Sequence, residues 1–327
     1  MSRRRLAAVL TVLALLVGAG TVVGFASGAF SDPPRPGGSA ATAGPTATSG
    51  PTLASNPISR PSAGPSTAPT PTTSASPGTG YYLALGDSLA AGFQNGADHR
   101  TEGYVGAVRT AVERRDGPTT LVNLACSGET TTSMLRGGGC TYDRGSQLAE
   151  AERFLRDHAA DVRLVTLDIG GNDVARCGFG GLEPSCTKPA LATLSRNLPV
   201  ITSRLRAAAP DVQIMLLNYY DPFLVLDLFG GSGSSVPGPG QRSVTELAKV
   251  NGAIAASARS SAAQVADVAA AFDTTDTAPT VVKGVGTLPA NLARIVTWTW
   301  MAPPRFDFHA NDAGYAVMAR AVERRLR

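Results

Sequence analysis

A serine and a histidine far apart in the chain could together carry out nucleophilic chemistry. Ser88 stands in Gly86-Asp87-Ser88-Leu89, directly after a short apolar run, and His309 lies in a loop that leads into the last helical stretch. A serine hydroxyl becomes a nucleophile when a neighbouring histidine takes its proton. The alternative for Ser88 is an N-cap serine, which is a common role for this residue type at the start of a helix.

The histidine of such a site has few candidates, because the chain contains only three. His158 ends a charged helical stretch, where a histidine is commonly structural. His99 lies in a polar loop, Asn95–Arg100, and is expected to be solvated rather than catalytic. His309 differs from both, because it lies in the loop that leads straight into the final helical stretch.

Two short segments could supply hydrogen-bond donors to a developing oxyanion. Gly128 follows Cys126-Ser127, and Asn172 lies in Gly170-Gly171-Asn172-Asp173. A glycine lets a backbone N–H approach a reacting group closely, and an asparagine amide can supply a second donor. Each segment taken alone is also an ordinary turn signal.

The elements that must position these residues alternate between strand and helix. Short apolar runs, typical of buried strands, occur at Tyr81–Asp87, Leu121–Cys126, Val162–Ile169, Val212–Tyr219 and, more weakly, Gln264–Phe272. Helix-like stretches occur at Tyr104–Arg115, Ser146–His158, Ala190–Ala208, Val244–Ala262 and Asp312–Arg327. This alternation predicts a parallel sheet that is covered by helices on both faces, with the ligand site at the carboxyl ends of the strands.

The motifs come in an order that resembles the GDSL lipase/esterase family, also called SGNH hydrolases. Gly-Asp-Ser follows the first run, a glycine the second and Gly-x-Asn-Asp the third, and Asp-x-His precedes the terminal helix. The resemblance covers essentially all of residues 81–327. The stretch Ala125–Thr132, Gly-Ser-Gln-Leu at 145–148 and the paired cysteines are similar to the secreted actinobacterial branch. The resemblance to this family implies the flavodoxin-like three-layer α/β/α fold of SGNH hydrolases, with a central parallel sheet of about five strands.

The resemblance also implies a role for each motif residue. Ser88 would be the nucleophile and His309 the base that returns the proton to the leaving alcohol. The backbone N–H groups of Ser88 and Gly128, with the side-chain amide of Asn172, would form the oxyanion hole. Asp87 and Asp173 are interpreted as structural residues of their turns.

The acid of the site departs from the family pattern. The family usually has Asp-x-x-His, but here that position is Phe306 and the aspartate is Asp307, two residues before His309. We expect Asp307 to orient His309, and a main-chain carbonyl near Arg305 or Phe306 is the alternative.

The first 79 residues differ in composition from the rest. Met1–Arg5 contains three arginines, and an uncharged run from Leu6 to Phe30 follows. This pattern predicts an export segment at 1–30, either a cleaved signal peptide or an uncleaved membrane anchor. Residues 31–79 are rich in Pro, Ser, Thr, Ala and Gly and are interpreted as a disordered linker. Residues 80–327 form the expected catalytic domain, located outside the cell.

The distribution of charge along the chain indicates which partners the protein could bind. The net charge of +4 comes entirely from residues 1–79, because the remaining chain contains 24 basic and 24 acidic residues. Nucleic-acid binding therefore has no compositional support. We expect a monomer that contacts a membrane only through its N-terminal segment and takes an ester substrate.

Four cysteines, Cys126, Cys140, Cys177 and Cys186, lie in the expected domain. An even number in an exported chain indicates two disulfides, for which three pairings exist. The pairs Cys126–Cys140 and Cys177–Cys186 are favoured because their members are close in sequence and flanked by glycine. A metal site is the alternative, although no Cys-x-x-Cys spacing supports it.

Motifs of other enzyme classes are absent from the sequence. Ser88 is not in Gly-x-Ser-x-Gly, and the chain has no His-Glu-x-x-His, no Walker lysine and no Gly-x-Gly-x-x-Gly. No metal or nucleotide cofactor is therefore implied.

The expected function is a cofactor-independent serine esterase or lipase. The alternatives are a carbohydrate O-deacetylase that uses the same site, and a surface-tethered module that binds carbohydrate or lipid without turnover.

Overall fold

The computed structural model describes residues 78–178, 182–228 and 238–327. The expected export segment at 1–30 and nearly all of the expected linker at 31–79 lie outside the described residues. No helix within the described ranges is long and apolar enough to cross a bilayer.

The centre of the structure is a five-stranded parallel sheet in the order β2-β1-β3-β4-β5. Its strands are β1 (Gly80–Gly86), β2 (Thr119–Asn123), β3 (Val162–Asp168), β4 (Ile214–Leu217) and β5 (Gln264–Ala266). This is the strand order of flavodoxin-like doubly wound folds, in which the ligand site lies where the order reverses. The prediction of a flavodoxin-like parallel sheet is confirmed.

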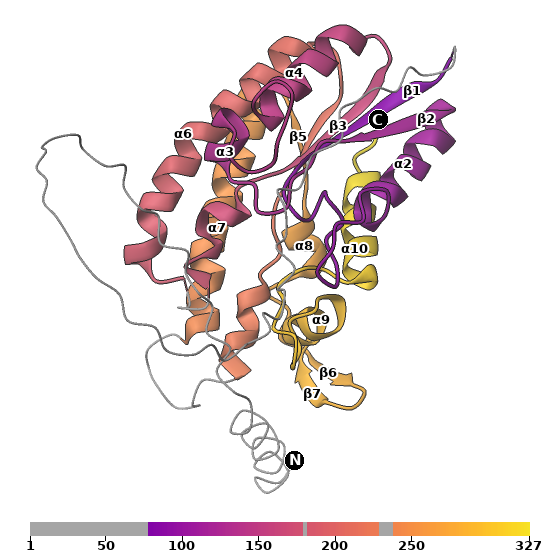
Figure 1. The fold of residues 1–327 in the computed structure, drawn as a ribbon. Helices are drawn as coiled ribbons and strands as arrows, with labels where there is room; N and C mark the ends of the chain where they lie inside the picture. The colour runs from indigo at the N-terminus through magenta and orange to yellow at the C-terminus, as the bar shows by residue number, and fades with distance from the viewer. Residues whose placement is uncertain (1–77, 179–181, 229–237) are drawn as a thin grey trace, which may run out of the picture. The chain divides into compact units, whose positions relative to one another are not determined.

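Helices cover both faces of this sheet (Figure 1). The helices are α2 (Gly103–Asp116), α3 (Thr131–Arg136), α4 (Gln147–His158), α5 (Gly171–Ala175), α6 (Pro184–Ala208), α7 (Pro239–Ser260), α8 (Val268–Phe272), α9 (Ala290–Trp298) and α10 (Asp312–Glu323), with a 3₁₀ helix η2 (Pro222–Leu228). Helices α2 and α10 pack together on one face, and α4, α6 and α7 lie on the other (Figure 1). The three-layer arrangement follows because each face of a parallel sheet is apolar and must be covered.

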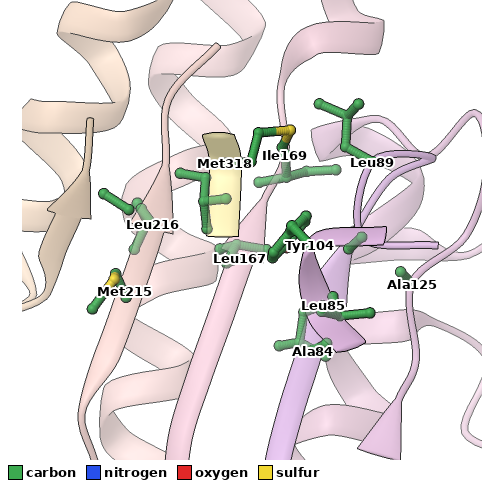
Figure 2. Close-up of a cluster of buried hydrophobic side chains, with 14 of the residues drawn as sticks. Ala84, Leu85, Leu89, Tyr104, Ala125, Leu167, Ile169, Met215, Leu216 and Met318 are labelled. Atoms are coloured by element: carbon green, nitrogen blue, oxygen red, sulfur yellow. The ribbon is translucent and has the colours of Figure 1, made fainter. Parts of the chain in front are cut away.

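The core lies between the sheet and the helices. All seven residues of β1 are buried, which explains why this strand reads as a continuous apolar run rather than an alternating one. Figure 2 shows side chains from β1, β3 and β4 together with Tyr104 of α2 and Met318 of α10. Tyr104 and Met318 have no exposed surface. The strands that precede the candidate site residues are therefore fixed by packing on both faces.

The structure corrects the expected fifth strand. The apolar run Gln264–Phe272 contains only a three-residue strand, and its second half is helix α8. Asp267 separates the two, because its side chain accepts a hydrogen bond from the backbone N–H of Ala270 and caps the helix. Periodicity alone does not separate a short strand from a short buried helix.

Several further elements were not predicted. Helix α6 begins at Pro184, six residues before the expected start, with proline in its first turn. A two-stranded antiparallel hairpin, β6 (Pro279–Val282) and β7 (Gly286–Pro289), precedes α9. These elements lie in stretches with weak periodicity and much Gly, Pro and Thr, so the sequence pattern did not reveal them.

Replacing Gly86 by alanine should destabilise the fold by about 2–4 kcal/mol. Gly86 has φ of +134°, and a Cβ there would lie 2.1 Å from the carbonyl oxygen of Asp168. The matched control is Gly252→Ala in α7, where a Cβ would meet nothing within 4 Å. That change should be neutral or stabilise by up to about 1 kcal/mol. Urea unfolding of both variants measures the difference, and equal stabilities would contradict the close approach at Gly86.

Candidate active site

The turn after β1 presents Ser88. The Asp87 carboxylate accepts the backbone N–H of Leu89 at 3.0 Å, and the Asp87 carbonyl accepts the N–H of Ala91 at 3.0 Å. Asp87 thus forms an Asx turn, and because residues 88–92 are turns rather than the start of a helix, the N-cap alternative for Ser88 does not apply. The Ser88 hydroxyl, in a residue that is 6% exposed, instead contacts a histidine ring.

His309 connects Ser88 to Asp307. Its Nε2 lies 2.8 Å from Ser88 Oγ, and its Nδ1 lies 2.5 Å from Asp307 Oδ1. The same carboxylate oxygen accepts the backbone N–H of His309 at 3.0 Å. An aspartate two residues before the histidine thus reaches both the ring and the main chain. The described hydrogen bond of Nδ1 goes to this carboxylate rather than to a main-chain carbonyl near Arg305 or Phe306.

The backbone of the loop before α10 allows Asp307 to reach His309 from only two residues away. Phe306 adopts a φ of +48°, which turns the chain just before Asp307. Main-chain hydrogen bonds join Trp300 N–H to the His309 carbonyl and Asp307 N–H to the Trp300 carbonyl, at 3.0 and 3.1 Å. The rings of Phe93 and Phe308 pack on the imidazole, with centroids 4.4 and 4.5 Å away. His309 is therefore held in place on several sides.

The charge of Asp307 follows from its surroundings. Partial burial tends to raise its pKa, but the hydrogen bonds from the His309 ring and backbone, together with the charges of His309 and Arg305, outweigh this effect. The pKa of Asp307 lies below its ordinary value, so the carboxylate is ionised at neutral pH. An ionised partner at Nδ1 fixes the tautomer in which Nε2 can accept the serine proton.

Gly128 lies in the segment after β2 and Asn172 in the first turn of α5, and these two segments are hydrogen-bonded to each other. Asn172 Nδ2 donates to the carbonyl of Glu129 at 3.0 Å, directly after Gly128. The carboxylate of Asp173 accepts the backbone N–H and the hydroxyl of Thr131, at 2.9 and 2.6 Å. Gly128 has φ of +84°, a conformation that favours glycine. Asn172 lines the same cavity as Ser88, so the structure brings the predicted donors to one edge of the sheet.

Both predicted disulfides are present. Cys126 is bonded to Cys140 and Cys177 to Cys186, with Cα–Cα distances of 6.0 and 5.9 Å. The first begins two residues before Gly128, and the second begins five residues after Asn172. The alternative of a cysteine metal site is thereby excluded.

The other two histidines lie elsewhere. His158, at the end of α4, packs against the rings of Tyr81 and Phe154, with centroids 4.9 and 4.7 Å away. His99 lies 3.9 Å from Glu102 on the molecular surface. Both have the structural or solvated roles expected from the sequence.

Sequence reasoning missed several residues that fix the Ser88 turn, among them Gln147 and Tyr219. Gln147, at the start of α4, accepts the N–H of Gly86 at 2.7 Å and donates to its carbonyl at 2.9 Å. Tyr219, after β4, donates its hydroxyl to Asp87 at 2.8 Å. The only sequence signal for Gln147 was its place in Gly-Ser-Gln-Leu. Tyr219 gave no separate signal, because it lies at the end of an apolar run.

An apolar cavity of about 60 Å³ opens beside Ser88. Its apolar walls come from Leu89, Val174, Ala175, Pro222, Phe223, Leu247 and Phe308. Asn172 and the rings of Tyr219 and Tyr220 also line it. The cavity can take an apolar group whose reacting end lies against Ser88 and Asn172.

A larger depression of about 900 Å³ lies at the opposite end of the sheet, near the first residues of β3, β4 and β5. It contains several arginines, of which Arg206 donates to the carbonyls of Ser261, Ala209, Pro210, Val212 and Ala262. Ser88 and His309 lie at the carboxyl ends of the strands and do not line this depression. Size alone is therefore a poor guide to the site in this protein.

Comparison with known proteins identifies the family of the chain. The model of the GDSL-like lipase/acylhydrolase family matches residues 84–317, which include every candidate site residue. The chain belongs to the GDSL-like lipase/acylhydrolase family. This GDSL-like protein is therefore an ester hydrolase, and the module that only binds is not supported.

Solved structures similar to this GDSL-like hydrolase have low sequence identity. Phospholipase A1 from Streptomyces albidoflavus is 19% identical with a TM-score of 0.48, and the match covers 75% of this chain and 98% of that one. An extracellular lipase from Streptomyces rimosus is 20% identical with a TM-score of 0.49, covering 75% and 99%. A family 3 carbohydrate esterase from Clostridium thermocellum is 14% identical with a TM-score of 0.41, covering 75% and 94%. No curated protein sequence matches the chain.

Proposed function

We propose that the protein is an extracellular serine esterase in which Ser88 is the nucleophile and His309 the general base. The observation that carries this proposal is the chain of hydrogen bonds Ser88–His309–Asp307, with an ionised carboxylate at its end. A nucleophile, a base and an orienting acid in hydrogen-bond contact are what acyl transfer requires. No cofactor takes part in the proposed mechanism.

Attack and acyl transfer follow from this arrangement. Ser88 Oγ attacks the ester carbonyl carbon as its proton passes to His309 Nε2, and Asp307 stabilises the imidazolium that forms. The oxyanion accepts hydrogen bonds from the N–H groups of Ser88 and Gly128 and from Asn172 Nδ2. His309 then gives the proton to the leaving alkoxide, which departs as the alcohol and leaves an acyl group on Ser88. Water activated by His309 releases the acid in the second half of the reaction.

The cavity beside Ser88 supports a short acyl group. Its volume of about 60 Å³ is small beside the roughly 300–1,000 Å³ of pockets for drug-sized ligands. Phe223 forms one wall, and its ring lies against the backbone of Gly178, where an added Cβ would be 2.1 Å from the ring. Gly178 follows Cys177 of the second disulfide, so this wall is supported by a cross-linked loop. We propose esters of short carboxylic acids as substrates, and acetyl groups on carbohydrates are the second candidate because they also fit this volume.

The location outside the cell is part of the proposal. Two disulfides are typical of exported proteins, and the arginine cluster and apolar run of residues 1–30 are typical of an export segment. Residues 31–79 would act as a spacer between that segment and the catalytic domain at 80–327. A monomer is sufficient for the proposed chemistry, because every group it uses comes from one chain.

Ser88→Ala tests the function itself. It should lower kcat for p-nitrophenyl butyrate by at least roughly 10³-fold, because the attacking oxygen is lost. The free energy of unfolding should change by no more than about 1 kcal/mol, since only one hydrogen bond is removed. An activity assay and urea unfolding check both expectations. Retention of most activity would remove Ser88 from the mechanism.

Asp307→Asn tests how His309 is oriented. Loss of the carboxylate favours the wrong tautomer of the ring and should lower kcat by several orders of magnitude, roughly 10⁴ in the serine-protease template. His309→Ala is the reference, because it removes the base under any model. The two variants are compared at a pH well above that at which histidine protonates. A loss of tenfold or less for Asp307→Asn would mean that a main-chain carbonyl orients the ring during turnover.

Phe223→Ala should shift the acyl-chain preference toward longer chains. Each methylene that enters the enlarged cavity contributes about 0.8 kcal/mol, so two of them should raise the ratio of kcat/KM for hexanoate over butyrate about tenfold. Phe154→Ala is the matched control, because Phe154 packs against Tyr81 at the other end of β1. It should lower stability without changing the ratio. A ratio that is unchanged in Phe223→Ala would place the acyl group elsewhere.

A further inference from the structure

Asp221 is a buried residue that takes no part in the proposed mechanism. It lies between β4 and η2 and is 2% exposed. Its Oδ1 accepts a hydrogen bond from the backbone N–H of Phe223 at 3.0 Å, which forms an Asx turn at the start of η2. Its Oδ2 accepts a hydrogen bond from the hydroxyl of Ser243 in α7 at 2.7 Å. Asp221 therefore ties the start of η2 to a helix that follows later in the chain.

This hydrogen bond joins two walls of the cavity beside Ser88. Pro222 and Phe223 line the cavity from η2. Leu247, one helical turn after Ser243, lines it from α7. The distance between these walls therefore depends on how closely η2 lies against α7.

Other contacts hold the same segment against α7 on either side of Asp221. Asn251 accepts a hydrogen bond from the backbone N–H of Tyr219 at 3.0 Å, and its side-chain amide donates to the Tyr219 carbonyl at 2.9 Å. The backbone N–H of Gly240 donates to Asp227 at 2.8 Å near the end of η2. Removal of the Asp221 contact alone would therefore leave the segment attached to α7 at both ends. The effect would be greatest in the stretch between them, which forms the cavity wall.

The burial of both partners makes the cavity sensitive to this contact. Ser243 has no exposed surface, and deletion of its hydroxyl would leave an Asp221 oxygen inside the protein without that donor. A buried carboxyl oxygen must regain a hydrogen bond, because an unpartnered one is costly. Water that replaces the hydroxyl needs more room than the hydroxyl did, so η2 would move away from α7 and the cavity would widen.

We propose that Asp221 is a positioning residue that, through Ser243, sets the width of the acyl cavity by holding η2 against α7. The inference rests on the proposed function, because it takes the cavity beside Ser88 as the acyl site. The hydrogen bonds described for Asp221 go to η2 and α7 and not to Ser88 or His309. A change at Asp221 or Ser243 should therefore alter the acyl-chain preference rather than the chemical step.

Ser243→Ala and Ser257→Ala form a matched pair of variants. Both serines lie in α7, are 0% and 1% exposed, and use their hydroxyl in a side-chain hydrogen bond, which Ser257 forms with Thr202 at 2.9 Å. Ser257 lies about 21 Å further along the helix and does not line the cavity.

The acyl-chain preference of this pair is the first test. Ser243→Ala should raise the ratio of kcat/KM for p-nitrophenyl hexanoate over butyrate about fourfold, which is the contribution of one further buried methylene. Ser257→Ala should keep the wild-type ratio, and urea unfolding checks that both variants are folded. The same ratio in the two variants would overturn the inference. A ratio that shifts in Phe223→Ala but not in Ser243→Ala would overturn this inference alone and leave the proposed function standing.

Variants of Asp221 are the second test. Asp221→Ala loses both contacts and should raise the ratio at least as far as Ser243→Ala. Asp221→Asn keeps an oxygen for the Phe223 N–H, and its amide can donate to the Ser243 hydroxyl while that hydroxyl donates to the Gly240 carbonyl, 2.7 Å away. It should therefore keep the wild-type ratio.

The double variant Asp221→Ala/Ser243→Ala shows whether the two residues act together. Its shift should be no larger than that of Asp221→Ala, because both changes remove the same contact. Additive shifts would mean that Ser243 acts without Asp221 and would contradict the inference. Failure of Asp221→Ala to fold leaves the matched serine pair as the deciding measurement.

Hydrogen exchange tests the contact without using activity. Backbone amides of residues 219–228 should exchange faster in Ser243→Ala than in wild type, and at the wild-type rate in Ser257→Ala. Equal exchange in the two variants would show that Ser243 does not hold η2, whatever Ser88→Ala shows. Retained activity in Ser88→Ala together with faster exchange in Ser243→Ala alone would contradict the proposed function and still support the contact that holds η2.

Discussion

The close approach of β1 and β3 at their carboxyl ends is the constraint on which the site depends. Gly86 pairs with Asp168 in the register of these strands, and the next backbone N–H, that of Asp87, lies 3.0 Å from the Asp168 carbonyl. The chain must leave the sheet at this point with a positive φ and no side chain. Ser88 is thereby placed at the sheet edge where the loops after β2 and β3 also end.

Polar side chains from several elements hold the turn that carries Ser88. Gln147 binds both main-chain groups of Gly86, and its Nε2 also lies 3.1 Å from a carboxylate oxygen of Glu129, the residue after Gly128. Asn172 binds the Glu129 carbonyl from the first turn of α5. The Ser88 turn and the segments of Gly128 and Asn172 are therefore parts of one hydrogen-bonded network. Such a network rigidifies the groups that it joins. The proposed stabilisation of an oxyanion depends on donors that are held in place in this way.

His309 reaches this network from the other end of the described chain. Helix α10 packs against α2. It begins just after His309, where the side chain of Asn311 caps the helix by accepting the N–H groups of Ala313 and Gly314. Tyr220 donates its hydroxyl to the carbonyl of Phe308 at 2.7 Å and joins the loop to the end of β4. Packing of α10 on α2 thus brings His309 to Ser88 across 221 residues of sequence.

The sequence by itself determined the parallel α/β fold and both disulfide pairs, and it proposed Ser88, Gly128, Asn172 and His309 as the candidate site. These features depend on local signals: apolar runs that end in Gly-Asp or Gly-Gly, and cysteines that are close in the chain. The tertiary structure alone decided that Asp307 contacts His309 from two residues away, because that contact depends on the positive φ of Phe306 and on main-chain pairing with Trp300. It also decided the roles of Gln147, Asp168 and Tyr219, whose hydrogen bonds to the Ser88 turn span 61, 81 and 132 residues. Contacts over such separations leave no periodic pattern in a sequence, since they are set by the strand order and by which helices cover each face.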